Sequence, residues 1–127
     1  MTPHVDFLIR LFRFWAAFNA IIGMSLSAFA CAAATIVVTG ARLEAPGTEV
    51  AAGVTTATFT LLALAALVWS AAHAICARGL TERRAWARNA SLVLAVLNLL
   101  LLPFGTALGL YTIWVALHEE VRRTFEA

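Results

Sequence analysis

The chain has 127 residues, of which 62% are hydrophobic and 13% are charged, and its formal net charge is +2. Soluble domains are usually about half apolar and roughly a quarter charged, and a fold this small leaves much of its surface in contact with solvent. A soluble core could not cover this much apolar surface, so we predict a single integral membrane domain in a lipid bilayer. The small net charge gives no reason to expect a nucleic-acid partner.

The amino end has a polar stripe. In residues 4–13, Asp6, Arg10 and Arg13 fall on one side of a helix whose remaining surface is mostly apolar. Such a segment lies in the membrane interface or extends the first span below the membrane. We predict an interfacial segment here.

Two long apolar segments follow. Residues 14–38 are almost uncharged and are long enough to cross a hydrocarbon core of about 30 Å. A signal peptide cleaved after Ala30 is the alternative, but the apolar run continues to Val38. Residues 39–49 are rich in Gly, Pro and charge and predict a loop, and residues 53–76 form the second predicted span.

The last apolar stretch, residues 90–117, is too long for one span and short for two. Pro103 and Gly105 near its middle favour a turn or a broken helix. We predict two short helices, residues 86–102 and 104–121, in a tight hairpin. One long kinked helix is the alternative.

The arginines favour four spans. With four spans, the amino end, the basic linker and the carboxyl end share one side, and of the nine arginines only Arg42 lies opposite. This is a strong positive-inside pattern, which three spans would weaken. We therefore predict an all-α four-helix membrane bundle with both termini cytoplasmic. The linker arginines would meet lipid headgroups or merely set the topology; they are Arg78, Arg83, Arg84 and Arg88.

The carboxyl-terminal half resembles a group of small, uncharacterised bacterial four-helix inner-membrane proteins. The likeness covers about residues 76–125 and is carried by Trp86-Ala87-Arg88, by Leu97-Asn98-Leu99 and by a Pro-x-Gly-Thr-x-x-Gly-x-Tyr motif at residues 103–111. It implies the fold and a bacterial inner membrane. It implies no catalytic residues, because the group has no established activity.

Small residues recur at one-turn spacing. Gly105 and Gly109 form a Gly-x-x-x-Gly pattern, which lets another helix approach closely. The partner is either another molecule or, as we favour, the preceding helix of the same chain. Gly23 and Ser27 give a second such face, and Thr106 is a candidate cap for the fourth helix.

A few polar side chains lie within the spans. Asn98 is the strongest candidate for a polar site within a span, and Asn19 is the second, because a primary amide in hydrocarbon needs hydrogen-bond partners. We favour an interhelical hydrogen bond over a pore lining or a ligand site. The alternative of a wet pore would also use the threonines of the second span, which are Thr55, Thr56, Thr58 and Thr60.

Histidines and cysteines are the remaining candidates for chemistry. His73 and Cys76 share one face of the second span, and His4 and His118 are predicted on the cytoplasmic side. A zinc or copper site needs more ligands at one depth, so we expect interfacial histidines and no metal or cofactor. Cys31 and Cys76 are separated in depth, which predicts two buried free thiols and no disulfide.

The sequence predicts a non-enzymatic function. No charged residue lies deep within a span, which disfavours an ion-coupled pump, and no nucleophile or phosphate-binding motif is present. We predict a helix-packing module, either an accessory or scaffold subunit for other membrane proteins or a self-associating protein. A homo-oligomeric channel is the alternative, and a membrane enzyme or carrier that uses His73 is a third.

Overall fold

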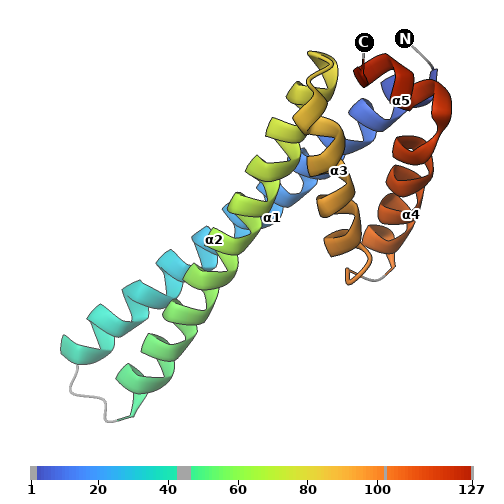
Figure 1. Cartoon of the computed structure of the whole chain (residues 1–127). Helices are drawn as coiled ribbons and strands as arrows, with labels where there is room; N and C mark the ends of the chain where they lie inside the picture. The colour runs from blue at the N-terminus through green and yellow to red at the C-terminus, as the bar shows by residue number, and fades with distance from the viewer. Residues whose placement is uncertain (1–2, 43–46, 102, 127) are drawn as a thin grey trace. The chain divides into compact units, whose positions relative to one another are not determined.

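The structure of the protein is a computed structural model that describes residues 3–42, 47–101 and 103–126 (Figure 1). Every regular element among these residues is helical, so the predicted all-α class is confirmed. The elements are α1 (Pro3–Arg42), α2 (Thr48–Thr81), α3 (Ala85–Asn98), α4 (Phe104–Leu117) and α5 (Glu119–Glu126). Two predictions fall partly outside the described residues: the loop at 39–49, and the third span at its last residue, 102.

Two of these helices are long and apolar enough to cross a membrane, at 40 residues for α1 and 34 for α2. At 1.5 Å per residue they measure about 60 and 51 Å, well beyond a hydrocarbon core of about 30 Å. In contrast, α3 and α4 have 14 residues each. Both are shorter than the predicted spans, which were 86–102 and 104–121.

The chain divides into two compact units. Unit 1 comprises Met1–Ala16 and Ala71–Ala127, and unit 2 comprises Ala17–Ser70. Unit 2 is a hairpin formed by the carboxyl-terminal part of α1 and the amino-terminal part of α2. Within it, the rings of Phe29 and Phe59 stack with centroids 5.7 Å apart. Most large apolar side chains of unit 2 are exposed, among them Ile21, Met24, Leu61 and Val68.

Unit 1 buries the amino end of α1. Val5, Leu8 and Phe12 are at most 4% exposed, and Val5 and Leu8 share a small internal space with Val115 of α4 and Val121 of α5. Residues 4–13 are thus the opening turns of α1, and the buried part of their apolar surface packs against protein. The predicted polar stripe remains outside, because Arg10 and Arg13 are exposed.

The connections in unit 1 settle two open points. The region around Pro103 is a turn between separate helices, because α3 ends at Asn98 and α4 begins at Phe104, so a single kinked helix is wrong. The predicted continuous helix 104–121 is also wrong, because His118 is extended with ψ of 130° and separates α4 from α5.

Candidate functional site

The interior of unit 1 holds a buried polar pair. The Nε2 atom of His73 on α2 lies 3.0 Å from the Nδ2 atom of Asn98 at the end of α3, and both side chains are fully buried. The ring of Phe12 lies against His73, with centroids 5.3 Å apart. Asn98 therefore contacts another helix, as the sequence analysis favoured. Its partner His73 is fully buried, so the expectation of an interfacial histidine is wrong for this residue.

Ser91 and Thr112 are the other buried polar side chains among the described residues, and we call the set of His73, Ser91, Asn98 and Thr112 the polar core. Ser91 donates to the carbonyl oxygen of Arg88 at 2.7 Å, and Thr112 donates to that of Leu108 at 2.7 Å. The Oδ1 atom of Asn98 is buried with no hydrogen-bond partner in the part of the chain that the structure describes. The side-chain amide of Asn98 thus uses its nitrogen to bond the imidazole, while its oxygen makes no such bond within the described ranges.

The outside of the hairpin is apolar. The buried positions of α4 include Gly105, Gly109 and Thr112. The opposite side, which we call the apolar face of α4, consists of Phe104, Leu110, Trp114 and Leu117, all at least 50% exposed. On α3, Val93, Val96 and Leu97 are likewise exposed. Unit 1 thus exposes large apolar side chains on α3 and α4, while four polar side chains are buried in a core that is otherwise apolar. An exposed apolar surface of this size is unusual in a soluble protein.

The glycines of α4 are used within the molecule. A Cβ added to Gly105 would lie 2.5 Å from the carbonyl oxygen of Asn98, and one added to Gly109 would lie 2.5 Å from that of Ala95. The Gly-x-x-x-Gly face therefore packs on the backbone of α3. The partner of the glycine face is therefore the preceding helix of the same chain, as the sequence analysis favoured. The face is covered within one molecule.

Thr106 was predicted to cap the start of the fourth helix, and in the structure it bonds to the end of α3 instead. No side chain caps the start of α4, where Pro103 occupies the cap position. The Thr106 hydroxyl instead donates to the carbonyl oxygen of Leu99 at 3.2 Å, and the Leu101 amide donates to that of Asn98 at 2.9 Å. These contacts satisfy carbonyls at the end of α3, which a tip inside a bilayer requires.

Gly23 and Ser27 lie in unit 2. A Cβ on Gly23 would meet Leu67 at 2.7 Å, so Gly23 is a packing position between α1 and α2. Ser27 is half-buried and donates to the carbonyl oxygen of Gly23 at 2.8 Å. Asn19, the second polar candidate, is also half-buried and belongs to the same unit.

The threonines of α2 are bonded to their own helix. Each hydroxyl donates at 2.8 Å to the carbonyl oxygen four residues earlier, as in the bond from Thr55 to Ala51. This pattern is common for threonine in membrane helices, because it removes a polar group from hydrocarbon. Asn98, the other candidate for a wet lining, is buried beside His73.

α2 ends in a Schellman motif with arginine in the left-handed position. Arg83 has φ of 55°, its amide donates to the carbonyl oxygen of Leu80 at 3.2 Å, and the Arg84 amide donates to that of Gly79 at 3.0 Å. Glycine usually occupies this position, since a Cβ makes the left-handed region costly. The turn brings Arg84 back beside Glu82.

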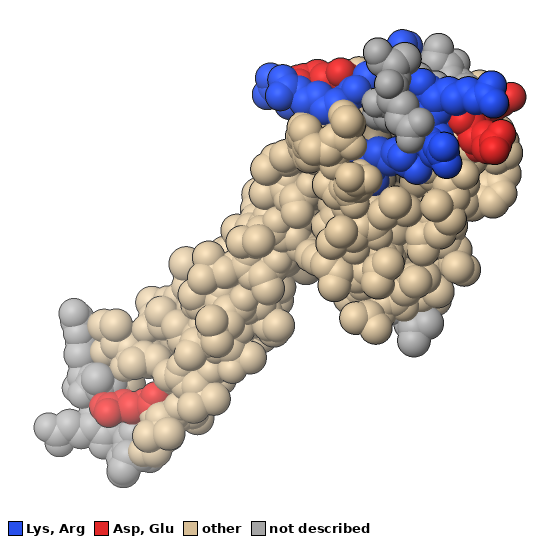
Figure 2. Space-filling view, in the orientation of Figure 1, with Lys and Arg blue, Asp and Glu red and all other residues tan. Residues whose placement is uncertain are grey.

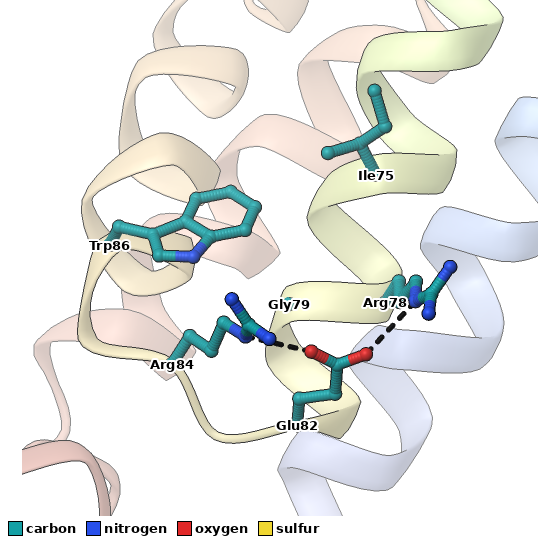
Figure 3. A pocket seen from close by; sticks show the side chains of 6 residues that line it. All are labelled: Ile75, Arg78, Gly79, Glu82, Arg84 and Trp86. Atoms are coloured by element: carbon teal, nitrogen blue, oxygen red, sulfur yellow. Dashed lines mark hydrogen bonds and ion pairs between the residues drawn. The ribbon is translucent and has the colours of Figure 1, made fainter.

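Glu82 binds two arginines from either side of this turn (Figure 3). Its Oε1 atom lies 2.9 Å from Nε of Arg78, and its Oε2 atom lies 2.7 Å from Nε of Arg84. The hydrogen bond from Arg78, with the charges of both guanidinium groups, lowers the pKa of Glu82. These residues border a shallow space that we call the basic hollow, lined by Ile75, Arg78, Gly79, Glu82, Arg84 and Trp86.

The other predicted headgroup arginines have different surroundings. Arg83 is exposed, whereas Arg88 is half-buried and donates from Nε to the carbonyl oxygen of Ala116 at 3.1 Å. Arg88 thus caps the carboxyl end of α4, where a cation is favoured. Figure 2 shows the charged side chains of unit 1 gathered at the end that holds the α2–α3 connection and α5.

The histidines do not converge. His4 and His118 each lie against Trp114, with ring centroids 5.2 and 5.3 Å away, while His73 is in the polar core. Among the described residues no group of three or more His, Cys, Asp or Glu could hold a metal ion. Both cysteines are free as predicted, but only Cys76 is buried; Cys31 is exposed.

Sequence reasoning missed the basic hollow as a unit. The four-residue spacing of Arg78 and Glu82 is a recognisable helical ion pair. The second pair, with Arg84, depends on the backbone of Arg83, which no sequence pattern indicates. The contact of Trp86 with Gly79 was also missed, and it is so close that a Cβ on Gly79 would lie 2.7 Å from Cζ2 of Trp86.

The chain was compared with models of protein families, with curated proteins and with solved structures, and no match was found in any of the three comparisons.

Proposed function

We propose that this chain is an integral protein of the bacterial cytoplasmic membrane that acts without catalysis, by helix packing. It serves as an accessory or scaffold subunit for another membrane protein, or associates with itself. The observation that carries the membrane assignment is the exposed apolar surface, which comprises the apolar face of α4 in unit 1 and most large apolar side chains of unit 2. In water this distribution exposes large apolar side chains, whereas lipid tails accept them without cost.

The proposed topology follows from helix length and charge. α1 and α2 cross the bilayer, and eight of the nine arginines belong to unit 1 and lie on the cytoplasmic side. α3 and α4 measure about 21 Å each, some 9 Å less than the hydrocarbon core. We therefore propose that they enter from the cytoplasmic side and return to it, in place of two full crossings. Both termini remain cytoplasmic in either arrangement.

Helix packing is the proposed activity for two reasons. The buried polar side chains of unit 1 bond within the molecule, His73 to Asn98 and the two hydroxyls to the backbone, and unit 2 offers a wide apolar surface. Leu61 and Val68 of α2 are 68% and 69% exposed, and Ile21 and Met24 of α1 are similarly open. Lipid already accepts these side chains, so association in a membrane depends on close packing of helix faces and not on apolar exposure alone. The Gly105 and Gly109 face is already occupied by α3, so a partner uses another face, and we propose that of unit 2.

The test is crosslinking in native membranes. A photoreactive amino acid at Leu61 or Val68 is expected to give one discrete crosslinked product, either a dimer of this chain or a complex with one other membrane protein. The same residue at Glu49, which is exposed before the apolar part of α2, is the control. Purification in mild detergent as monomer alone, with no crosslink from either position, contradicts the proposal.

A further inference from the structure

The basic hollow has a charged end and an apolar end. Its volume is about 230 Å³, and Arg78, Glu82 and Arg84 border one end while Ile75 and Trp86 border the other (Figure 3). Ile75 is 60% exposed and Trp86 is 43% exposed, so both present apolar surface at the rim. Tryptophan prefers the level of lipid headgroups, where one part of its ring is wet and the other is not.

Glu82 holds both guanidinium groups by their Nε atoms. A guanidinium has five N–H donors, and the contact through Nε uses one of those of Arg78 and one of those of Arg84. Their planar, fixed donors match the oxygens of a phosphate. The trio has a net charge of +1, and the exposed Arg83 adds to the positive potential at the turn.

The Schellman turn and Gly79 set the shape of the hollow. The turn carries Arg84 back over the end of α2, and the absence of a side chain at Gly79 lets the ring edge of Trp86 rest on the helix backbone. The charged and apolar walls are therefore held together by backbone geometry. The arginine side chains themselves are exposed, at 83% for Arg78 and 61% for Arg84.

We propose that the basic hollow binds the phosphodiester of one anionic membrane phospholipid. Arg78 and Arg84 hold the phosphate, and Trp86 and Ile75 contact the glycerol and the start of an acyl chain. This inference rests on the proposed membrane insertion, which places the hollow at the cytoplasmic headgroup level. The apolar wall favours a lipid as the ligand, because free phosphate would contact only the arginines.

The test counts lipid bound to the full chain in mild detergent, by native mass spectrometry during titration with phosphatidylglycerol. One phosphatidylglycerol molecule is expected to stay bound, with phosphatidylcholine retained about tenfold less. The double variant Arg78→Gln/Arg84→Gln is expected to weaken phosphatidylglycerol binding about tenfold. The double variant Arg10→Gln/Arg123→Gln removes the same charge at exposed arginines that do not border the hollow, and is expected to change phosphatidylglycerol binding less than about threefold.

The variant Glu82→Gln distinguishes a specific lipid-binding site from nonspecific electrostatic attraction of anionic lipid to the arginines. If Glu82 positions the arginines, this variant weakens phosphatidylglycerol binding although it makes the protein more positive. Stronger binding in this variant, or equal losses in the two double variants, overturns the proposal. So does displacement of the lipid by inorganic phosphate at comparable concentration, which would indicate a free-phosphate site. Far-UV circular dichroism of each variant confirms that the helices are intact.

Alkaline extraction of membranes distinguishes this inference from the proposed function. If the parent chain is released by sodium carbonate, the membrane insertion itself is wrong. If the parent and all variants stay in the membrane while lipid binding is indifferent to Arg78 and Arg84, only the lipid site is wrong.

Discussion

The Nε2 atom of His73 lies 3.0 Å from Nδ2 of Asn98 in the buried interior of unit 1, and this contact joins α2 to the end of α3. The amide donates to the ring when the histidine is neutral and carries its proton on Nδ1. The pair therefore fixes where the short hairpin lies along α2.

Asn98→Ala is expected to destabilise the protein by about 1 kcal/mol, the size of an interhelical hydrogen bond in a membrane protein. It also removes the contact that His73 makes with Asn98. The measurement is unfolding by dodecyl sulfate in mixed micelles. Thr58→Ala is the control, because that exposed hydroxyl bonds only to its own helix. Equal stability of the two variants would show that the buried pair contributes nothing.

Gly109→Ala and Gly105→Ala are each expected to destabilise the α3–α4 hairpin by about 1–3 kcal/mol, because the added methyl meets a backbone oxygen that cannot rotate away. Gly53→Ala is the matched control, since no atom lies within 4 Å of its added Cβ. The same unfolding assay measures all three. A loss of oligomers without a loss of stability would instead make the glycine face an intermolecular surface.

Arg83→Gly is expected to stabilise the protein by up to about 1 kcal/mol, because glycine adopts the left-handed conformation without a Cβ clash. Arg83→Gln removes the same charge and keeps the Cβ, so it should give no gain. If both variants are stabilised equally, the cause is charge repulsion among the arginines. If neither is, the turn carries no strain.

Acid is expected to release the two arginines from Glu82. The pKa of Glu82 is lowered from its ordinary value of 4.5, so its ion pairs contribute fully above that value and are lost as the pH falls through the lowered pKa. The measurement is the emission of Trp86, taken as the difference between the parent and Trp86→Phe. A change below pH 4.5 that is absent in Glu82→Gln is the expected result. The same change in Glu82→Gln would assign it to another group.

The sequence was sufficient for features that depend on composition and local spacing. Of the four predicted spans, the first two are helices able to cross a membrane, whereas the last two are helices of only 14 residues. The Pro103 region was recognised as a break. The spacing of Gly105 and Gly109 predicted close helix packing and left its partner open. The resemblance to small bacterial four-helix proteins stays a prediction, as do the membrane topology and the function.

Features that depend on distant contacts were not predictable. The break between α4 and α5 is accompanied by a hydrogen bond from Arg88 to Ala116, 28 residues away. His73 and Asn98 are 25 residues apart and meet only after the chain has turned at Arg83. Because arginine stands where glycine usually marks such a turn, the pattern gave no signal for the site built around it.

The location of the chain ends and of the hairpin tip tests the proposed membrane insertion most directly. Single cysteines at Met1, Glu49, Leu100 and Ala127, in a background of Cys31→Ser and Cys76→Ala, are labelled with a membrane-impermeant maleimide in intact cells and in inverted vesicles. Labelling of Glu49→Cys from outside, of both termini only from inside, and of Leu100→Cys from neither side is the expected result. Termini on opposite faces, or a chain recovered in solution without detergent, would contradict it.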